Sequence, residues 1–148
     1  MNIAFIGCGK LGMPCAEEIA KAGHTVTGYD PVLINRDGTF FNPNGFVDLK
    51  HTVAEAVKFA KIVFVAVPTP HDSEYDGRAP TAHLEPKDFD YTTVKQVLDE
   101  ADTYMHEDQL LVLISTVLPG TVRRELEPLV TNTRFVYNPY LIAMGSVA

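Results

Sequence analysis

The fold is decided by residues 1–30, which read MNIAFIGCGKLGMPCAEEIAKAGHTVTGYD. Asn2–Ile6 is short and apolar, which is typical of a buried strand. Residues 10–22 carry apolar side chains at helical spacing, and Thr25–Tyr29 has the composition of a second strand. This stretch therefore predicts a strand, a glycine turn, a helix and a second strand that ends at Asp30.

The turn between the first strand and the helix contains three glycines. Gly7, Gly9 and Gly12 form the pattern G-x-G-x-x-G. In a dinucleotide site the first glycine permits a tight turn, the second lets a pyrophosphate approach the backbone, and the third lets the helix pack closely on the strand. Unpaired N–H groups and the dipole at the start of the helix attract the phosphate charge.

Asp30 supplies the acid that such a site needs. It follows Gly12 by 18 residues, close to the roughly 20 expected of a carboxylate that binds the adenosine ribose hydroxyls. A carboxylate in this place repels a 2′-phosphate, so the sequence favours NAD over NADP. The glycine pattern alone also fits an ordinary turn, but the strand, the helix and the acid around it favour a dinucleotide-binding fold.

The rest of the chain repeats the alternation of strands and helices. The longest polar connection is the loop at 71–88, and loops of this length are usually functional or mobile. Further strands are predicted at 46–49, 62–67, 110–115 and 135–137, and further helices at 32–36, 52–60, 90–105 and 119–129.

This order predicts an α/β fold of the Rossmann type. We expect a doubly wound, mainly parallel sheet of order 3-2-1-4-5-6 with helices on both faces, and a single domain that comprises residues 1–148. Ligands of such sheets bind at the carboxyl ends of the strands. That edge would bring together the glycine turn, Asp30, residues 68–70, residues 115–116 and Asn138.

The composition excludes several classes of function. The chain is 46% hydrophobic with a net charge of −7, and it has no basic patch, so we expect no nucleic-acid partner. It has neither a signal peptide nor an apolar run long enough to span a bilayer, so we expect no membrane association. Cys8 and Cys15 lie too close to the glycine turn to suggest a disulfide framework, which indicates a reducing, cytoplasmic location. The five histidines show no ligand spacing, so no metal is expected.

Four motifs make the sequence resemble a known family. They are GCGKLGMP at 7–14, VAVPTP at 65–70, STVLPGT at 115–121 and YNP at 137–139. Together they resemble the amino-terminal NAD-binding domain of the UDP-glucose/GDP-mannose dehydrogenases. That family oxidises the C6 alcohol of a nucleotide sugar to a carboxylate, passing two hydrides to two NAD molecules through a thiohemiacetal on a cysteine. The resemblance therefore implies NAD as cofactor and a role in nucleotide-sugar metabolism and polysaccharide biosynthesis.

The same resemblance implies roles for individual residues. The pyrophosphate would be held by the whole glycine turn, which comprises Gly7, Cys8, Gly9, Lys10, Leu11 and Gly12. Asp30 would bind the adenosine ribose, and Arg36 would approach the cofactor. The cleft near the nicotinamide-side ribose would be lined by Val67, Pro68, Thr69 and Pro70. Ser115 and Thr116 would lie near the nicotinamide, where the Thr116 hydroxyl would orient a catalytic water.

Three departures from the family pattern bear on catalysis. After Asn-Pro the family usually continues Glu-Phe-Leu-x-Glu-Gly, whereas this chain reads Tyr140-Leu141-Ile142-Ala143-Met144-Gly145. Tyr140 and Met144 thus replace two carboxylates, and Tyr140 becomes the remaining candidate for acid–base catalysis, although a phenol is a poor base at neutral pH. The sequence ends at Ala148, before the family's catalytic cysteine, lysine and asparagine, and residues 31–45 are shorter than the family's second crossover.

Three hypotheses follow from the sequence. In the first, the chain is an NAD-binding domain that is incomplete for catalysis alone and works with a nucleotide sugar bound by a second domain or chain, and a homodimer would cover apolar surface near its carboxyl end. In the second, it is a complete small NAD-dependent oxidoreductase for another hydroxy compound, with Tyr140 as the proton donor or acceptor. In the third, it is a non-catalytic assembly or sensing module. We interpret Cys8 and Cys15 as buried fillers rather than as nucleophiles.

Overall fold

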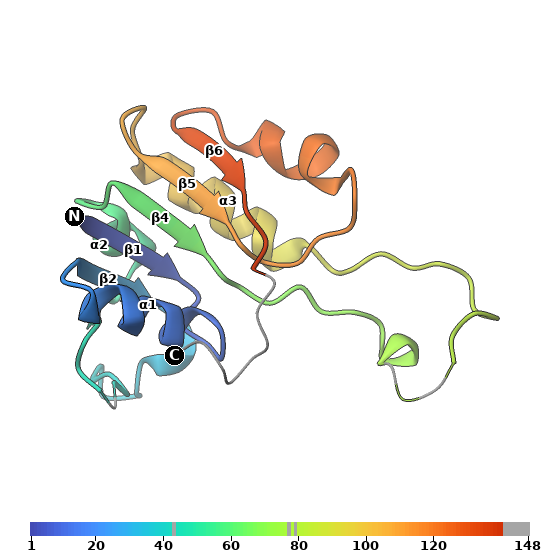
Figure 1. Cartoon of the computed structure of the whole chain (residues 1–148), viewed down its shortest axis with the longest axis horizontal. Coiled ribbons are helices and arrows are strands. Elements are labelled where there is room, and N and C mark those ends of the chain that lie inside the picture. The colour runs from blue at the N-terminus through green and yellow to red at the C-terminus, as the bar shows by residue number, and fades with distance from the viewer. Residues whose placement is uncertain (43, 77, 79, 141–148) are drawn as a thin grey trace.

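Six parallel strands form one sheet in the order β3-β2-β1-β4-β5-β6 (Figure 1). The computed structural model describes residues 1–42, 44–76, 78 and 80–140. The strands are β1 (Asn2–Ile6), β2 (Thr25–Tyr29), β3 (Asp48–Leu49), β4 (Ile62–Val65), β5 (Leu110–Leu113) and β6 (Arg134–Tyr137). The predicted strand order is confirmed. In the register, Ile6 pairs with both Tyr29 and Val65, so the carboxyl ends of the three central strands meet at one level.

The helices cover the sheet from both sides (Figure 1). On one face, α1 (Gly12–Lys21) packs on β1 and β2, and its residues Cys15 and Ala16 are buried in the core of that face. On the other face, α2 (Val53–Val57) and α3 (Thr92–Tyr104) build a second core around Val63, Leu98 and Leu111. None of the helices in the described part of the chain is long and apolar enough to cross a membrane.

The predicted helix at 32–36 is wrong. Residues Pro31–Leu33 form only one 3-10 turn, η1, after which Ile34 pairs with Phe40 in an antiparallel bridge. Between these two residues, the carboxylate of Asp37 accepts a hydrogen bond from the N–H of Thr39 at 3.0 Å, and Gly38 adopts a φ of +81°. This turn reverses the chain before a second helical turn can form.

Other predicted segments form in shortened or altered shape. The helix predicted at 52–60 ends at Val57, and its start is capped by Thr52, whose hydroxyl accepts from the Glu55 N–H at 3.1 Å. The helix predicted at 119–129 is a π-helical turn, η3 (Val122–Leu126), followed by a 3-10 turn, η4 (Glu127–Leu129). Pro128 lacks an N–H group, so a regular α-helix cannot continue through it.

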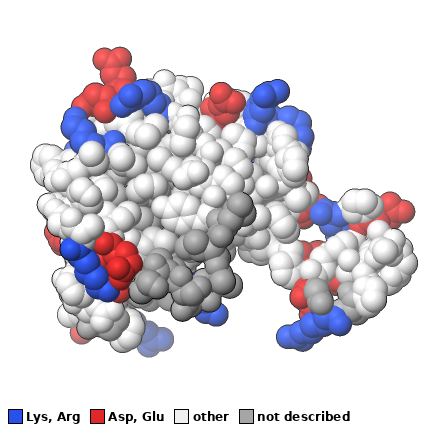
Figure 2. Space-filling view, viewed as in Figure 1, with Lys and Arg blue, Asp and Glu red and all other residues white. Residues whose placement is uncertain are grey.

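The described residues between 70 and 90, here called the arm, project away from the sheet between β4 and α3 (Figure 1). Figure 2 shows the arm as a separate lobe that carries both acidic and basic side chains. Its base is closed by a hydrogen bond from the Asp90 N–H to the Pro70 carbonyl at 2.8 Å. Further out, the Lys87 ammonium contacts Asp72 at 2.8 Å and Glu74 at 3.0 Å, beside a 3-10 turn, η2 (Ser73–Tyr75). The long polar loop is therefore folded on itself.

Candidate functional site

Two glycines of the turn after β1 are required by the packing of the protein itself. Gly7 has a φ of +90°, and a Cβ added to it would lie 2.7 Å from backbone atoms of Ala66, the residue directly after β4. A Cβ on Gly12 would lie 1.9 Å from the Gly7 carbonyl oxygen. Any larger residue at either position must push the turn, the helix and the neighbouring strand apart.

Gly9 differs from the two glycines that flank it. A Cβ added to Gly9 would meet no protein atom within 4 Å, and its φ is not positive. Neither the packing nor the backbone conformation of the chain therefore requires a glycine here. The open space above its backbone is what a pyrophosphate needs for a close approach.

The start of α1 faces the same space with unpaired N–H groups. No side chain caps the helix, and its first turn contains no acid. Among the described residues, no hydrogen bond uses the N–H groups of Gly9, Lys10 or Leu11. Unpaired donors at the positive end of a helix dipole are the features that attract anions to helix starts.

Asp30 lies half-buried at the end of β2 and is tied to the glycine turn. Its Oδ2 accepts from the Cys8 N–H at 2.9 Å, and its Oδ1 accepts from the Val32 N–H at 2.9 Å. Each carboxylate oxygen keeps a further lone pair for a ribose hydroxyl. The predicted ribose acid thus has a second role, which is to join the glycine turn to η1, and the spacing in the sequence did not reveal this role.

Cys8 contributes its backbone to the site while its thiol is buried below. Burial, and then the nearby charge of Asp30, raise the pKa of this thiol to about 12. Burial also raises the pKa of the Cys15 thiol. Thiols that stay protonated are weak nucleophiles, which supports the interpretation of both cysteines as core fillers.

The ends of β4 and β5 form the second half of the site. The buried Ser115 hydroxyl donates to the Val67 carbonyl at 2.7 Å, so it links the two strand ends rather than facing a ligand. Thr116 is exposed next to it, and Pro68 and Pro70 are exposed at the end of β4. The structure thus joins Val67 to Ser115 at the carboxyl ends of β4 and β5, the edge where the sequence places residues 68–70 and 115–116.

Arg36 and Tyr140 lie in different surroundings from the other residues predicted for the site. Arg36 is exposed in the loop between Ile34 and Phe40, and among the described residues it forms no ion pair. Tyr140 is half-buried on the face of the sheet that carries α1, with its ring centroid 6.4 Å from that of Phe64. Burial raises the pKa of Tyr140. The predicted departures at residues 141–145 lie outside the described residues.

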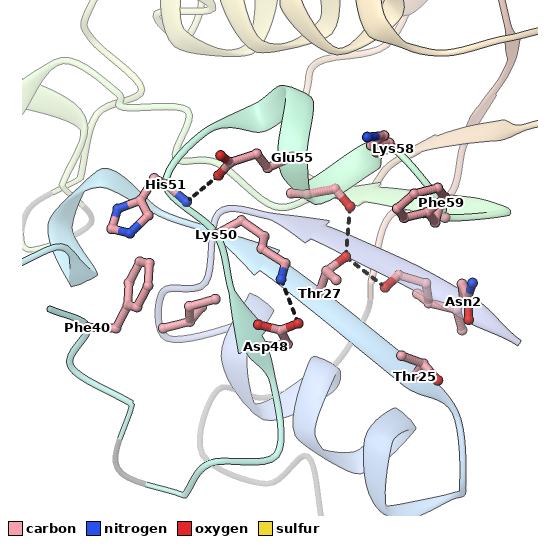
Figure 3. A pocket seen from close by; sticks show the side chains of 14 residues that line it. Asn2, Thr25, Thr27, Phe40, Asp48, Lys50, His51, Glu55, Lys58 and Phe59 are labelled. Carbon is pink, nitrogen blue, oxygen red and sulfur yellow. Dashed lines mark hydrogen bonds and ion pairs between the residues drawn. The ribbon is translucent and has the colours of Figure 1, made fainter. Parts of the chain in front are cut away.

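A hollow of about 640 Å³ lies elsewhere, on the α2 face of β1, β2 and β3 (Figure 3). Several of its polar groups are paired with one another: the Thr27 hydroxyl donates to the Ala56 carbonyl at 2.7 Å, and Lys50 contacts Asp48 at 2.6 Å. It also begins at Asn2 and Thr25, at the amino ends of the strands. We therefore assign the candidate site to the opposite, carboxyl edge of the sheet, where unpaired donors converge.

Comparison with known proteins identifies the family. The model of the UDP-glucose/GDP-mannose dehydrogenase family, NAD binding domain, matches residues 42–147. A UDP-N-acetyl-D-mannosamine dehydrogenase of Methanococcus aeolicus is 23% identical over an alignment of 153 positions, which covers 94% of this chain and 33% of that protein. A probable 3-hydroxyisobutyrate dehydrogenase of Mycobacterium tuberculosis is 34% identical over 68 residues, which are 46% of this chain and 22% of that protein.

Solved structures agree on the fold. A GDP-mannose dehydrogenase from Pseudomonas aeruginosa matches with a TM-score of 0.74 and 22% identity, over 99% of this chain and 38% of that one. A UDP-D-ManNAc dehydrogenase from Pyrococcus horikoshii matches with a TM-score of 0.71 and 23% identity, again over 99% and 38%. The chain spans about a third of the length of its curated UDP-N-acetyl-D-mannosamine dehydrogenase relatives. With the family model matched over most of its length, the chain belongs to the UDP-glucose/GDP-mannose dehydrogenase family and represents the NAD-binding domain of that family.

Proposed function

We propose that residues 1–148 act as one domain that binds NAD for a nucleotide-sugar dehydrogenase, an oxidoreductase that acts on a CH–OH group, and that this domain does not oxidise the sugar alone. The observation that carries the proposal is the open backbone at Gly9. It lies between two glycines that packing requires, at the uncapped start of α1. A glycine that the protein itself does not need supports a close approach by a ligand.

The proposed placement of NAD follows from the two ends of this site. The pyrophosphate lies over the glycine turn, and the adenosine ribose binds the remaining lone pairs of Asp30. Since Asp30 lies beside β2, the nicotinamide half extends the other way, toward the ends of β4 and β5. There Val67, Thr69 and the exposed Thr116 are proposed to line it. The Thr116 hydroxyl would orient the water that attacks during oxidation, as the family resemblance implies.

A second domain or chain is proposed to bind the nucleotide sugar and to supply the nucleophilic cysteine. Both cysteines of this chain are buried and are not placed for that role. The sheet supports such a partner: on the α1 side of β4–β6, Phe64 is only half-buried and Val136 is 44% exposed. Figure 2 shows few charged side chains in the middle of this view. Pairing with a second copy of this chain over the same face is the alternative assembly, and a reducing cytoplasm is the proposed location.

The proposal is tested by calorimetric titration of the chain with NAD and with NADP. We expect NAD to bind and NADP to bind more weakly, because the Asp30 carboxylate repels a 2′-phosphate. Asp30→Asn keeps one acceptor oxygen for the glycine turn but removes the charge, so it should weaken NAD binding and reduce the preference over NADP. Asp99→Asn is the matched control, since Asp99 is exposed on α3, far along the chain from the turn.

Two results would contradict the proposal. Absence of NAD binding to the folded chain would leave the glycine turn as scaffold and favour a non-catalytic module. Production of NADH from UDP-glucose, GDP-mannose or UDP-N-acetylmannosamine by this chain alone would show that it needs no second domain. Loss of such activity in Tyr140→Phe would then identify Tyr140 as the acid–base group of a complete small oxidoreductase.

A further inference from the structure

Three hydroxyl groups hold the segment that follows β5, residues 115–118, from three directions. The Ser115 hydroxyl donates to the Val67 carbonyl at the end of β4, at 2.7 Å. The Val117 N–H donates to the hydroxyl of Tyr137 at the end of β6, at 3.4 Å. The Leu118 N–H donates to the hydroxyl of Tyr91 at the start of α3, at 3.0 Å. The backbone on both sides of Thr116 is therefore fixed to other elements.

Of these three hydroxyl groups, that of Tyr91 is held in place by a second hydrogen bond. Its side chain is 5% exposed, and its hydroxyl donates to Oδ1 of Asp88 at 2.5 Å. Because the carboxylate accepts the hydrogen bond of the phenolic O–H, the lone pairs of the phenol oxygen are left for the Leu118 N–H. Burial and the bond to Asp88 also raise the pKa of Tyr91, so the group stays a neutral phenol across the physiological range. Asp88 thus sets the direction of the hydroxyl that holds Leu118.

Thr116 has the opposite character to its neighbours. Its side chain is exposed, and its hydroxyl forms no hydrogen bond with any of the described residues. A fixed backbone with a free hydroxyl is the arrangement needed to present a polar group to a ligand. In the placement of NAD described above, this hydroxyl faces the nicotinamide half.

We propose that Tyr91, oriented by Asp88, is a positioning residue for the nicotinamide end of the cofactor site. It holds residues 115–118 so that Thr116 meets the nicotinamide half of NAD, and it acts through that segment without touching the ligand. Since Asp88 belongs to the arm, the same contact joins the base of the arm to the cofactor site. This inference rests on the proposed function.

The test compares two ligands that share the adenosine, the pyrophosphate and the second ribose. NAD carries the nicotinamide, whereas ADP-ribose lacks it. Tyr91→Phe keeps the buried ring and deletes the hydroxyl, so we expect NAD affinity to fall about five- to tenfold, the size of one lost hydrogen bond, while ADP-ribose affinity changes less than about twofold. The amide oxygen of Asp88→Asn can still accept the hydrogen bond of the phenolic O–H, so this variant should keep most of the affinity that Asp88→Ala loses.

Tyr104→Phe is the control, because Tyr104 is the last residue of α3, the helix that Tyr91 directly precedes, and is 48% exposed. Thermal melting of each variant confirms that it is folded before titration. If Tyr91→Phe loses the same affinity for both ligands, or binds NAD like the wild-type chain, Tyr91 has no positioning role. The proposed function of NAD binding would still stand. Absence of binding of both ligands to the wild-type chain overturns the proposed function, and with it this inference.

Discussion

Alanine substitutions at Gly9 and at Gly12 separate the effect of the glycine turn on NAD binding from its effect on the stability of the fold. At Gly9 the added methyl group meets no atom within 4 Å, and the φ angle suits an L-residue. Gly9→Ala should therefore keep the stability of the fold or raise it by about 0.4–1 kcal/mol, because alanine restricts the unfolded chain. At Gly12 the same methyl group would lie 1.9 Å from the Gly7 carbonyl oxygen. Gly12→Ala should destabilise the fold by about 3 kcal/mol or more, since backbone must move.

Gly9→Ala should have opposite effects on folding and on NAD binding: the fold keeps its stability, whereas the affinity for NAD falls. In the proposed placement of NAD, the methyl group would occupy the space of the pyrophosphate, whose oxygens would lose one or more charge-assisted hydrogen bonds, each contributing about 1.5–3 kcal/mol. We expect NAD affinity to fall by about 10- to 100-fold. Chemical denaturation measures the stability of each variant, and calorimetric titration measures NAD binding. The reasoning is refuted if Gly9→Ala binds NAD like the wild-type chain, or if it loses as much stability as Gly12→Ala.

Further predictions concern stability, reactivity and pH. Asp102→Ala should destabilise the fold by about 3 kcal/mol in urea denaturation, because the buried carboxylate accepts the N–H groups of Thr131, Asn132 and Thr133, but it should leave NAD affinity unchanged. Cys8, with a pKa raised to about 12, should resist a thiol reagent at pH 8 in the folded chain and react in denaturant; fast labelling of the folded chain, located by peptide mass spectrometry, would contradict this. Hydrogen bonds in the folded chain lower the pKa of Asp37, Asp72 and Asp108 below the ordinary 3.8. The contribution of these carboxylates to stability should therefore be complete at neutral pH and decline as the pH falls below about 4. A melting temperature that is unchanged down to pH 2 would exclude this contribution.

Much of the fold could be predicted from local patterns in the sequence. The apolar runs, the glycine turn and the position of Asp30 depend on neighbours within a few residues or on a fixed distance along the chain, so strand order and the carboxyl-edge site followed from them. The prediction was wrong where a turn competes with a helix. At residues 32–36 the Asp37-Gly38 turn closes a bridge between Ile34 and Phe40, and no periodicity marks that outcome.

The inner construction of the site could not be predicted, because its contacts join residues far apart in sequence. Asp30 binds the Cys8 N–H across 22 residues, and Tyr91 binds the Leu118 N–H across 27. The sequence shows Asp30 only as a ribose acid and Tyr91 only as an apolar position on a helix. Each acquires its second role only when the strands are assembled, since the loops that follow parallel strands converge at one edge.

The central claim is that NAD binds across the glycine turn, and amide NMR during titration with NAD tests it most directly. The account predicts the largest shifts at the N–H groups of Gly9, Lys10 and Leu11, with smaller ones at Thr69 and Thr116. No shift at these amides, or shifts gathered around Thr27, Lys50 and His51 in the hollow on the α2 face, would contradict it.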